Sequence, residues 1–184
     1  MAVRILTDSA SDFDGVVASR RRIEVVPLPV QFGSASFLDG KTLSHEVFYK
    51  LLQEGKENPS TSQPTPAAFL RYFEEAKAAG DQVVAILLSG ALSGTIQSAQ
   101  IAKEMCEYAP IHIVDSRSAT AGMQILVNFA CKLRDSGLPA EDIAGEVERL
   151  REKVRIFAVI DTLEYLRRGG RLTGFQAGLG TVTK

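Results

Sequence analysis

The chain has 184 residues, of which 45% are hydrophobic, and its formal net charge is −1. This length and apolar content suffice for one well-filled core, or for one full domain and part of a second. The charge argues against nucleic-acid binding, which usually requires a broad basic face. The one dense basic run, residues 20–22, is more typical of a solvated helix end.

The cysteines and histidines exclude several kinds of site. Cys106 and Cys131 lie in segments with helical periodicity, where free cysteines behave as small buried hydrophobes rather than as a disulfide framework. His45 and His112 belong to no cluster with metal-ligand spacing, so we expect neither a metal site nor a histidine-based triad. The sequence has no signal-peptide pattern and no apolar run long enough to span a bilayer, which favours a reducing cytoplasm.

The first third of the chain predicts short strands, turns and a helix. In chain order, the expected elements are a strand over 3–7, a turn over 8–12 into a helix, a strand over 23–32, a hairpin around Gly33 and Asp39-Gly40, a helix over 44–52 and a polar loop over 54–66. Pro27 and Pro29 place the second strand at a sheet edge or on an irregular path.

The remainder alternates more regularly. The expected elements are helices over 66–79, 93–106, 119–135, 139–153 and 163–168, and strands over 83–88, 111–114 and 155–160. Thr65 can cap the first of these helices, with Pro66 at its first position. The nearly continuous apolar run over 83–88 is typical of a buried parallel strand. The alternation predicts an α/β fold with a mainly parallel sheet flanked by helices.

Hydroxyl-rich segments follow several of these strands. Ser9 comes after the first strand, Ser89 and Ser93 lie in the run over 89–95, and residues 115–118 and 60–63 supply two further clusters. Ligands in open α/β sheets bind beyond the carboxyl ends of the strands, where helix N-termini offer unpaired N–H groups. Each hydroxyl taken singly is better explained as a helix cap, but four clusters at one edge predict an anion site.

Enzyme motifs are approached but not completed. The run Gly-Ala-Leu-Ser-Gly over 90–94 places its serine one position too late for a nucleophile elbow and lacks the lysine of a phosphate-binding loop. Asp8 and Asp12 lack the alternating spacing of common phosphatases, and the glycines over 169–180 form no dinucleotide-binding motif. Since no nucleophile has an evident base, binding is favoured over catalysis and we expect no catalytic residue.

Five short motifs, in order and spanning the chain from residue 5 to about 175, resemble the DegV family. They are Thr7-Asp8-Ser9 with Asp12, Thr61-Ser62-Gln63-Pro64, Leu92-Ser93-Gly94-Thr95 with Gln97-Ser98-Ala99, Val114-Asp115-Ser116, and the run over 161–171. Members of that family are two-domain α/β proteins that bind a fatty acid. The resemblance implies a first domain over 1–153 and the beginning of a second, truncated α/β domain over 154–184.

The resemblance also implies a ligand and its contacts. A long-chain fatty acid such as palmitate would be buried between or within the domains, with no cofactor and no metal. Thr61 and Ser93 would bond its carboxylate, and Arg171 would lie near the head group. The other expected ligand-binding residues are Ser9, Ser62, Ser89 and Gly94. In some relatives the fatty acid is presented to a fatty acid kinase, so this chain would be a carrier with such a kinase as partner.

The chain departs from the family pattern at its C-terminal end. Typical members are longer, and their remaining part supplies most of the second domain and a histidine near the carboxylate, which neither His45 nor His112 replaces. The glycine-rich stretch from residue 169 ends without a closing element, and self-association could cover apolar surface left exposed.

Two other functions stay open. A phosphotransfer subunit of the dihydroxyacetone-kinase type has a related fold but needs a histidine in a strand-end loop, where neither histidine is predicted. A truncated interaction module without a ligand is the other. Two local features have simpler explanations than a role in binding. Arg167, Arg168 and Arg171 near a helix end can complement the helix dipole, and we expect two of the three to do only that. Phe69, Tyr72 and Phe73 are more typical of core than of a tunnel lining.

Overall fold

The computed structural model describes residues 1–55 and 57–173. A four-stranded parallel sheet has the order β2-β1-β6-β7. Its strands are β1 (Val3–Asp8), β2 (Ile23–Val26), β6 (Gln82–Leu87) and β7 (Ile111–Asp115). The predicted mainly parallel α/β fold is therefore confirmed.

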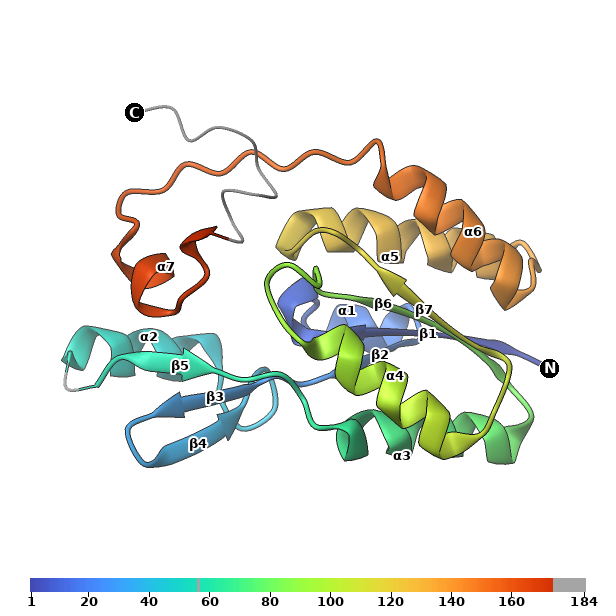
Figure 1. Ribbon diagram of the computed structural model, residues 1–184, viewed down its shortest axis with the longest axis horizontal. Helices are drawn as coiled ribbons and strands as arrows, with labels where there is room; N and C mark the ends of the chain where they lie inside the picture. Colours follow the sequence, from blue (N-terminus) through green and yellow to red (C-terminus); the bar gives the residue numbers. More distant parts are fainter. Residues whose placement is uncertain (56, 174–184) are drawn as a thin grey trace.

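Helices cover both faces of this sheet (Figure 1). One face packs against α1 (Gly15–Arg20), α5 (Thr120–Asp135) and α6 (Ala140–Arg151), and the other against α3 (Pro66–Ala79) and α4 (Thr95–Cys106). Because both faces are buried, the sheet strands are apolar along their length, and β6 is the clearest case, with residues 83–87 all at most 1% exposed.

A second, antiparallel sheet lies beside the carboxyl ends of the parallel strands (Figure 1). It has the order β4-β3-β5 and consists of β3 (Pro29–Phe32), β4 (Ala35–Leu38) and β5 (Pro59–Thr61). Helix α2 (His45–Glu54) covers it, and the rings of Phe32 and Phe48 meet edge to face with centroids 5.6 Å apart. The predicted hairpin is confirmed as β3–β4, whereas β5 was expected to be loop.

The predicted strand over 23–32 is two strands in two different sheets. Strand β2 ends at Val26 in the parallel sheet, and β3 begins at Pro29 in the antiparallel one. Proline lacks an N–H for the ladder and fixes its own φ, so Pro27 and Pro29 favour a break at this point. The expected irregular path is thus the crossover between the two sheets.

The predicted strand over 155–160 is wrong. The described chain runs through it in extended form to α7 (Glu164–Arg168), without a strand partner among the described residues. Phe157 is 93% exposed and Val159 is 100% exposed. An apolar, β-branched run has strand propensity, but a strand forms only where another backbone supplies hydrogen-bond partners.

Local predictions from caps and burial agree with the structure. Thr65 Oγ1 accepts a hydrogen bond from Ala68 N at 3.3 Å, with Pro66 at the first position of α3. Cys106 and Cys131 are buried free thiols, and burial raises the pKa of each. Within the described ranges no helix is both long and apolar enough to cross a membrane.

The expected domain boundary between residues 153 and 154 stays a prediction. The glycines at 174, 178 and 180, which contributed to the expectation of a truncated second domain, lie outside the described residues.

Candidate functional site

The carboxyl ends of β1 and β6 meet at the centre of the parallel sheet. Strand β2 lies outside β1 and β7 lies outside β6, so the chain direction of the crossovers reverses between the two central strands. Open α/β sheets bind ligands at such a point. Here Thr7 Oγ1 donates to Ile86 O at 2.8 Å, and Asp8 Oδ2 accepts from Leu88 N at 2.7 Å. These bonds fix the starting points of the two loops.

Asp8 is buried, and its carboxylate accepts hydrogen bonds from two backbone N–H groups. The second oxygen, Oδ1, accepts from Ala10 N at 3.0 Å. Burial raises the pKa of Asp8 to about 6, although the two backbone hydrogen bonds oppose that shift. Asp8 therefore links the end of β1 to the end of β6 through a buried hydrogen bond.

Ser9, a predicted ligand-binding residue, ties the two sheets together. Its Oγ accepts a hydrogen bond from Leu28 N at 3.0 Å, in the crossover from β2 to β3. Of the predicted site residues it is also the one that lines a cavity of about 490 Å³, which lies between α1, β2 and the start of α2. Thr61, Ser93 and Arg171 do not line that cavity, nor a second one of about 590 Å³ near Gln82 and Leu138.

The loop after β6 carries Ser89, Ser93 and Gly94 to the N-terminus of α4. Ser89 is 7% exposed and its Oγ accepts from Ala91 N at 3.3 Å, which is a local capping role. Ser93 is half-buried; its Oγ lies 2.8 Å from Thr95 Oγ1 and accepts from Thr95 N at 3.3 Å. A hydroxyl pair thus stands at the first turn of a helix, where backbone donors favour an anion.

The segment after β5 comes to the same helix end. Thr61 is exposed at the end of β5, and Ser62 N donates to Pro29 O at 3.2 Å. Gln63 Nε2 then donates to Ser98 Oγ on α4 at 2.9 Å. Gln63 was part of the recognised motif but was not among the predicted site residues, because a side chain that holds a loop has no signal of its own in the sequence.

Arg171 contacts the loop before α4. Its Nε donates to Leu92 O at 3.2 Å, and its Nη1 donates to Gly169 O at 2.6 Å. Arg167 and Arg168 instead form ion pairs with Glu164 on their own helix. The structure therefore brings the segments of Thr61 and Arg171 to the loop and first turn that carry Ser93, residues 92–98.

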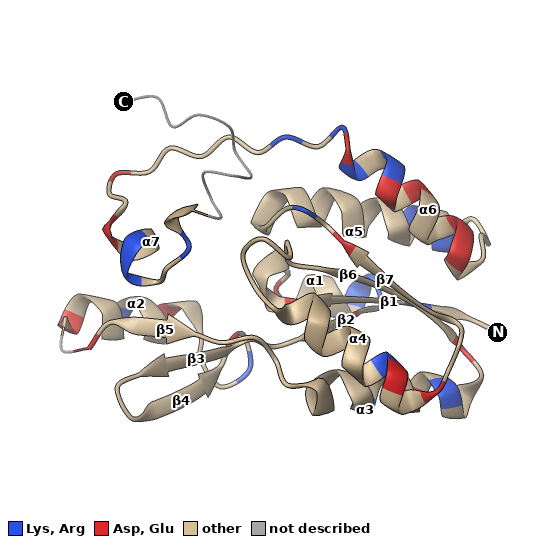
Figure 2. Cartoon of the chain, in the orientation of Figure 1, with Lys and Arg blue, Asp and Glu red and all other residues tan. Residues whose placement is uncertain are grey.

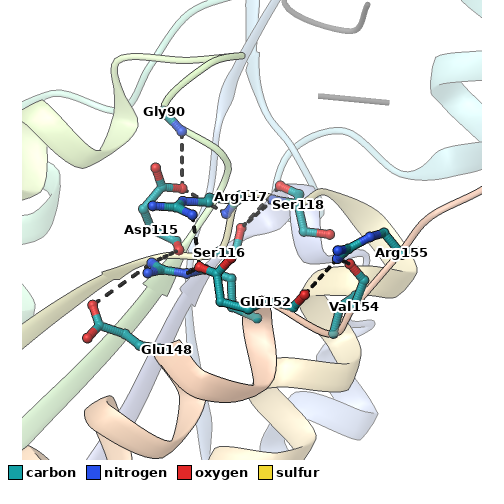
Figure 3. A network of polar contacts seen from close by, with 10 residues as sticks. Gly90, Asp115, Ser116, Arg117, Ser118, Glu148, Glu152, Val154 and Arg155 are labelled. Carbon is teal, nitrogen blue, oxygen red and sulfur yellow. Dashed lines mark hydrogen bonds and ion pairs between the residues drawn. The ribbon is translucent and has the colours of Figure 1, made fainter. Parts of the chain in front are cut away.

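The fourth predicted hydroxyl cluster supports its own loop (Figure 3). Asp115 Oδ1 accepts from Gly90 N at 3.3 Å and from Arg117 N at 2.8 Å. Ser116 Oγ donates to Ser118 O and accepts from Ser118 N, both at 3.1 Å. Since these groups are engaged with one another, this cluster braces the edge and is not part of the candidate head-group site.

The loop over residues 88–94 carries little formal charge. Residues 88–94 contain no charged side chain, and this loop is tan in Figure 2. The nearby donors are neutral hydroxyls and backbone N–H groups, with the guanidinium of Arg171 at the loop's margin. Such a site can orient a carboxylate without providing a metal or a nucleophile–base pair. The described residues contain no group of three or more His, Cys, Asp or Glu side chains placed to hold a metal ion.

The comparisons with known proteins agree on one family. The family model described as "Uncharacterised protein, DegV family" matches residues 2–184. A DegV domain-containing protein of Caldanaerobacter subterraneus subsp. tengcongensis is 39% identical over 180 residues, which are 98% of this chain and 64% of that protein. The chain thus spans less than two thirds of the length of this curated relative.

Two solved structures show the same fold. The structure titled fatty acid binding of a DegV family protein, from Thermus thermophilus, has a TM-score of 0.85 and 36% identity, and the match covers 100% of this chain and 65% of that one. The Streptococcus pneumoniae fatty acid kinase (Fak) B3 protein, loaded with linoleic acid, has a TM-score of 0.81 and 28% identity, covering 94% and 62%.

Proposed function

Because this chain belongs to the DegV family, we propose that it binds a long-chain fatty acid and acts as a carrier for it. The carboxylate is held by the hydroxyls of Thr61 and Ser93, with Arg171 beside the head group. One observation carries the proposal: the segments that bear these three residues, far apart in the sequence, meet at residues 92–98 through Gln63 and Arg171. Ser9, Ser62, Ser89 and Gly94 support this head-group site.

The physical chemistry of a fatty acid suits a site of neutral hydroxyls. Burial of a methylene contributes about 0.8 kcal/mol, so a chain such as that of palmitate supplies roughly 10 kcal/mol before ordering costs. The head-group contacts then need only to orient the carboxylate. Neutral donors can do so and leave one oxygen accessible to another protein.

We further propose that the role is carriage rather than catalysis, in the cytoplasm, with a fatty acid kinase as partner. The solved relative that is named a fatty acid kinase B3 protein supports the choice of partner. The dihydroxyacetone-kinase alternative lacks support, because His112 lies within β7 and the exposed His45 begins α2, so neither occupies a strand-end loop of the parallel sheet.

The division of labour along the chain is part of the proposal. Residues 1–153 form the first domain, and residues 154–184 begin a second. The exposed apolar side chains of the segment over 157–165 support this division, since the first-domain core does not cover them.

Lipid extraction tests the function directly. The purified chain is denatured and extracted with organic solvent, and the released lipid is identified by mass spectrometry with its yield normalised to protein. We expect close to one fatty acid per chain, directly or after incubation with palmitate. An empty extract under both conditions would refute fatty acid carriage by this chain.

A further inference from the structure

We propose that Gln63 is a positioning residue, which fixes the head-group loop by joining the segment after β5 to the first turn of α4. The inference rests on the proposed fatty acid site and deepens it. It assigns a role to a residue whose side chain donates to Ser98 and to neither of the proposed carboxylate-binding hydroxyls.

The first observation is a hydrogen bond to a buried partner. Gln63 Nε2 donates to Ser98 Oγ at 2.9 Å, and Ser98 is 1% exposed. The backbone N–H of Ser98 donates to Gly94 O at 3.1 Å, so Gly94 and Ser98 are the two ends of the first turn of α4. The amide of Gln63 is therefore bonded to the end of this turn. A hydroxyl this well buried needs a partner, and Gln63 supplies it from another part of the chain.

The second observation concerns the space above Gly94. A Cβ at this position would lie 2.8 Å from Gln63 Cδ and would overlap Oε1 of the same side chain. Gly94 has φ −76° and ψ 14°, a conformation open to residues with side chains. The glycine is therefore explained by the close approach of Gln63 and not by the backbone.

These contacts connect two parts of the fold that have separate cores. The residues before Gln63 belong to the antiparallel sheet with its own apolar cluster, whereas α4 packs on the parallel sheet. Thr61 lies two residues before Gln63, and Ser93 immediately precedes Gly94. Holding Gln63 on α4 thus sets the position of one proposed carboxylate donor relative to the other, and their cooperation depends on that geometry.

Two ligands that differ only in the head group separate a loss of head-group positioning from a general loss of lipid affinity. Gln63→Met keeps the approximate volume of the side chain but removes the amide. Its matched control is Gln97→Met, because Gln97 is an exposed glutamine on α4, the helix that Gln63 contacts. Equilibrium binding is measured for palmitate and for 1-hexadecanol. We expect Gln63→Met to weaken palmitate binding about tenfold, because a displaced Thr61 would lose its hydrogen bond to the charged carboxylate. Hexadecanol binding should change less than about twofold if the apolar contribution is intact.

Two further variants test whether the loss of palmitate affinity comes from the hydrogen bond between Gln63 and Ser98. Ser98→Ala should reproduce the loss seen for Gln63→Met, and the double variant should lose little more, because both changes break the same bond. Gly94→Ala should displace the flexible Gln63 side chain and act in the same direction. An equal loss for both lipids in Gln63→Met, or full additivity with Ser98→Ala, would overturn the inference.

Amide hydrogen exchange on the ligand-free chain decides the inference independently of lipid. We expect Gln63→Met to accelerate exchange at residues 93–95, and Gln97→Met to leave it unchanged. Exchange at these residues that is equal in the parent and in Gln63→Met would overturn the positioning role. A parent chain that binds neither lipid would refute the proposed function, and a faster exchange in Gln63→Met would then still support its hold on the loop.

Discussion

The carboxylate of Asp8, at the end of β1, accepts a hydrogen bond from the backbone N–H of Leu88, just past the end of β6, at 2.7 Å. Asp8 is 0% exposed, so this bond is made without solvent at the point where the two central strands of the parallel sheet end. A carboxyl group in such a place couples the stability of the sheet to pH.

We predict that the contribution of Asp8 to the free energy of unfolding falls as the pH rises from about 4 to about 6. Burial raises its pKa to about 6, whereas an unfolded aspartate titrates near ~3.9. Between these values the folded chain retains a proton that the unfolded chain has lost. The contribution is thus fully present below about pH 4 and is lost by about pH 6, a change of up to about 3 kcal/mol in the free energy of unfolding.

Urea unfolding of the parent and of Asp8→Asn between pH 4 and pH 7 checks this prediction. Acids whose pKa is lowered, such as Asp81 and Asp135, contribute the opposite slope, so the informative quantity is the difference between the two proteins. Parallel stability curves for parent and variant would show that Asp8 does not titrate differently in the folded chain.

Ser93→Ala should weaken fatty acid binding by about five- to tenfold, because it removes one neutral donor to the carboxylate. The measurement is a palmitate titration, and Ser60→Ala is the matched control, since Ser60 is an exposed neighbour of Thr61 on β5. Unchanged affinity and orientation in Ser93→Ala would remove Ser93 from the site.

Arg171→Met should weaken palmitate binding several-fold at low salt and reduce its dependence on ionic strength. The guanidinium supplies the positive charge beside residues 92–94, and salt screens a partly exposed charge. Arg167→Met is the control, because Arg167 pairs with Glu164 on the same short helix. An equal salt dependence in the parent and in Arg171→Met would place the head group elsewhere.

Val159→Lys should leave the free energy of unfolding within about 0.5 kcal/mol of the parent value, because the side chain is 100% exposed. It should also reduce any self-association measured by sedimentation, since it interrupts an exposed apolar segment. Val84→Ala, in the fully buried centre of β6, should by contrast cost about 2 kcal/mol. A large loss of stability in Val159→Lys would mean that this segment is buried in solution.

Much of the parallel-sheet layer follows from local sequence. The apolar run over 83–88 predicts a strand buried on both faces, and Thr65 with Pro66 predicts the start of α3. The hydroxyls after the strands predict a polar edge, because parallel strands end together. These features depend on backbone propensity, capping and burial periodicity, which neighbouring residues express by themselves.

Other features depend on segments that are distant in sequence. The three-residue strand β5 exists because β3 lies beside it, and residues 155–160 form no strand because no described backbone pairs with them. The approach of Gln63 to Gly94 brings residues 31 positions apart into contact, and Arg171 meets Leu92 across 79 positions. The sequence by itself determined the elements of the parallel-sheet layer and the chemistry at their ends, whereas the tertiary structure decided which ends meet and where further strands form, because pairing and close packing require a partner that local propensity does not specify.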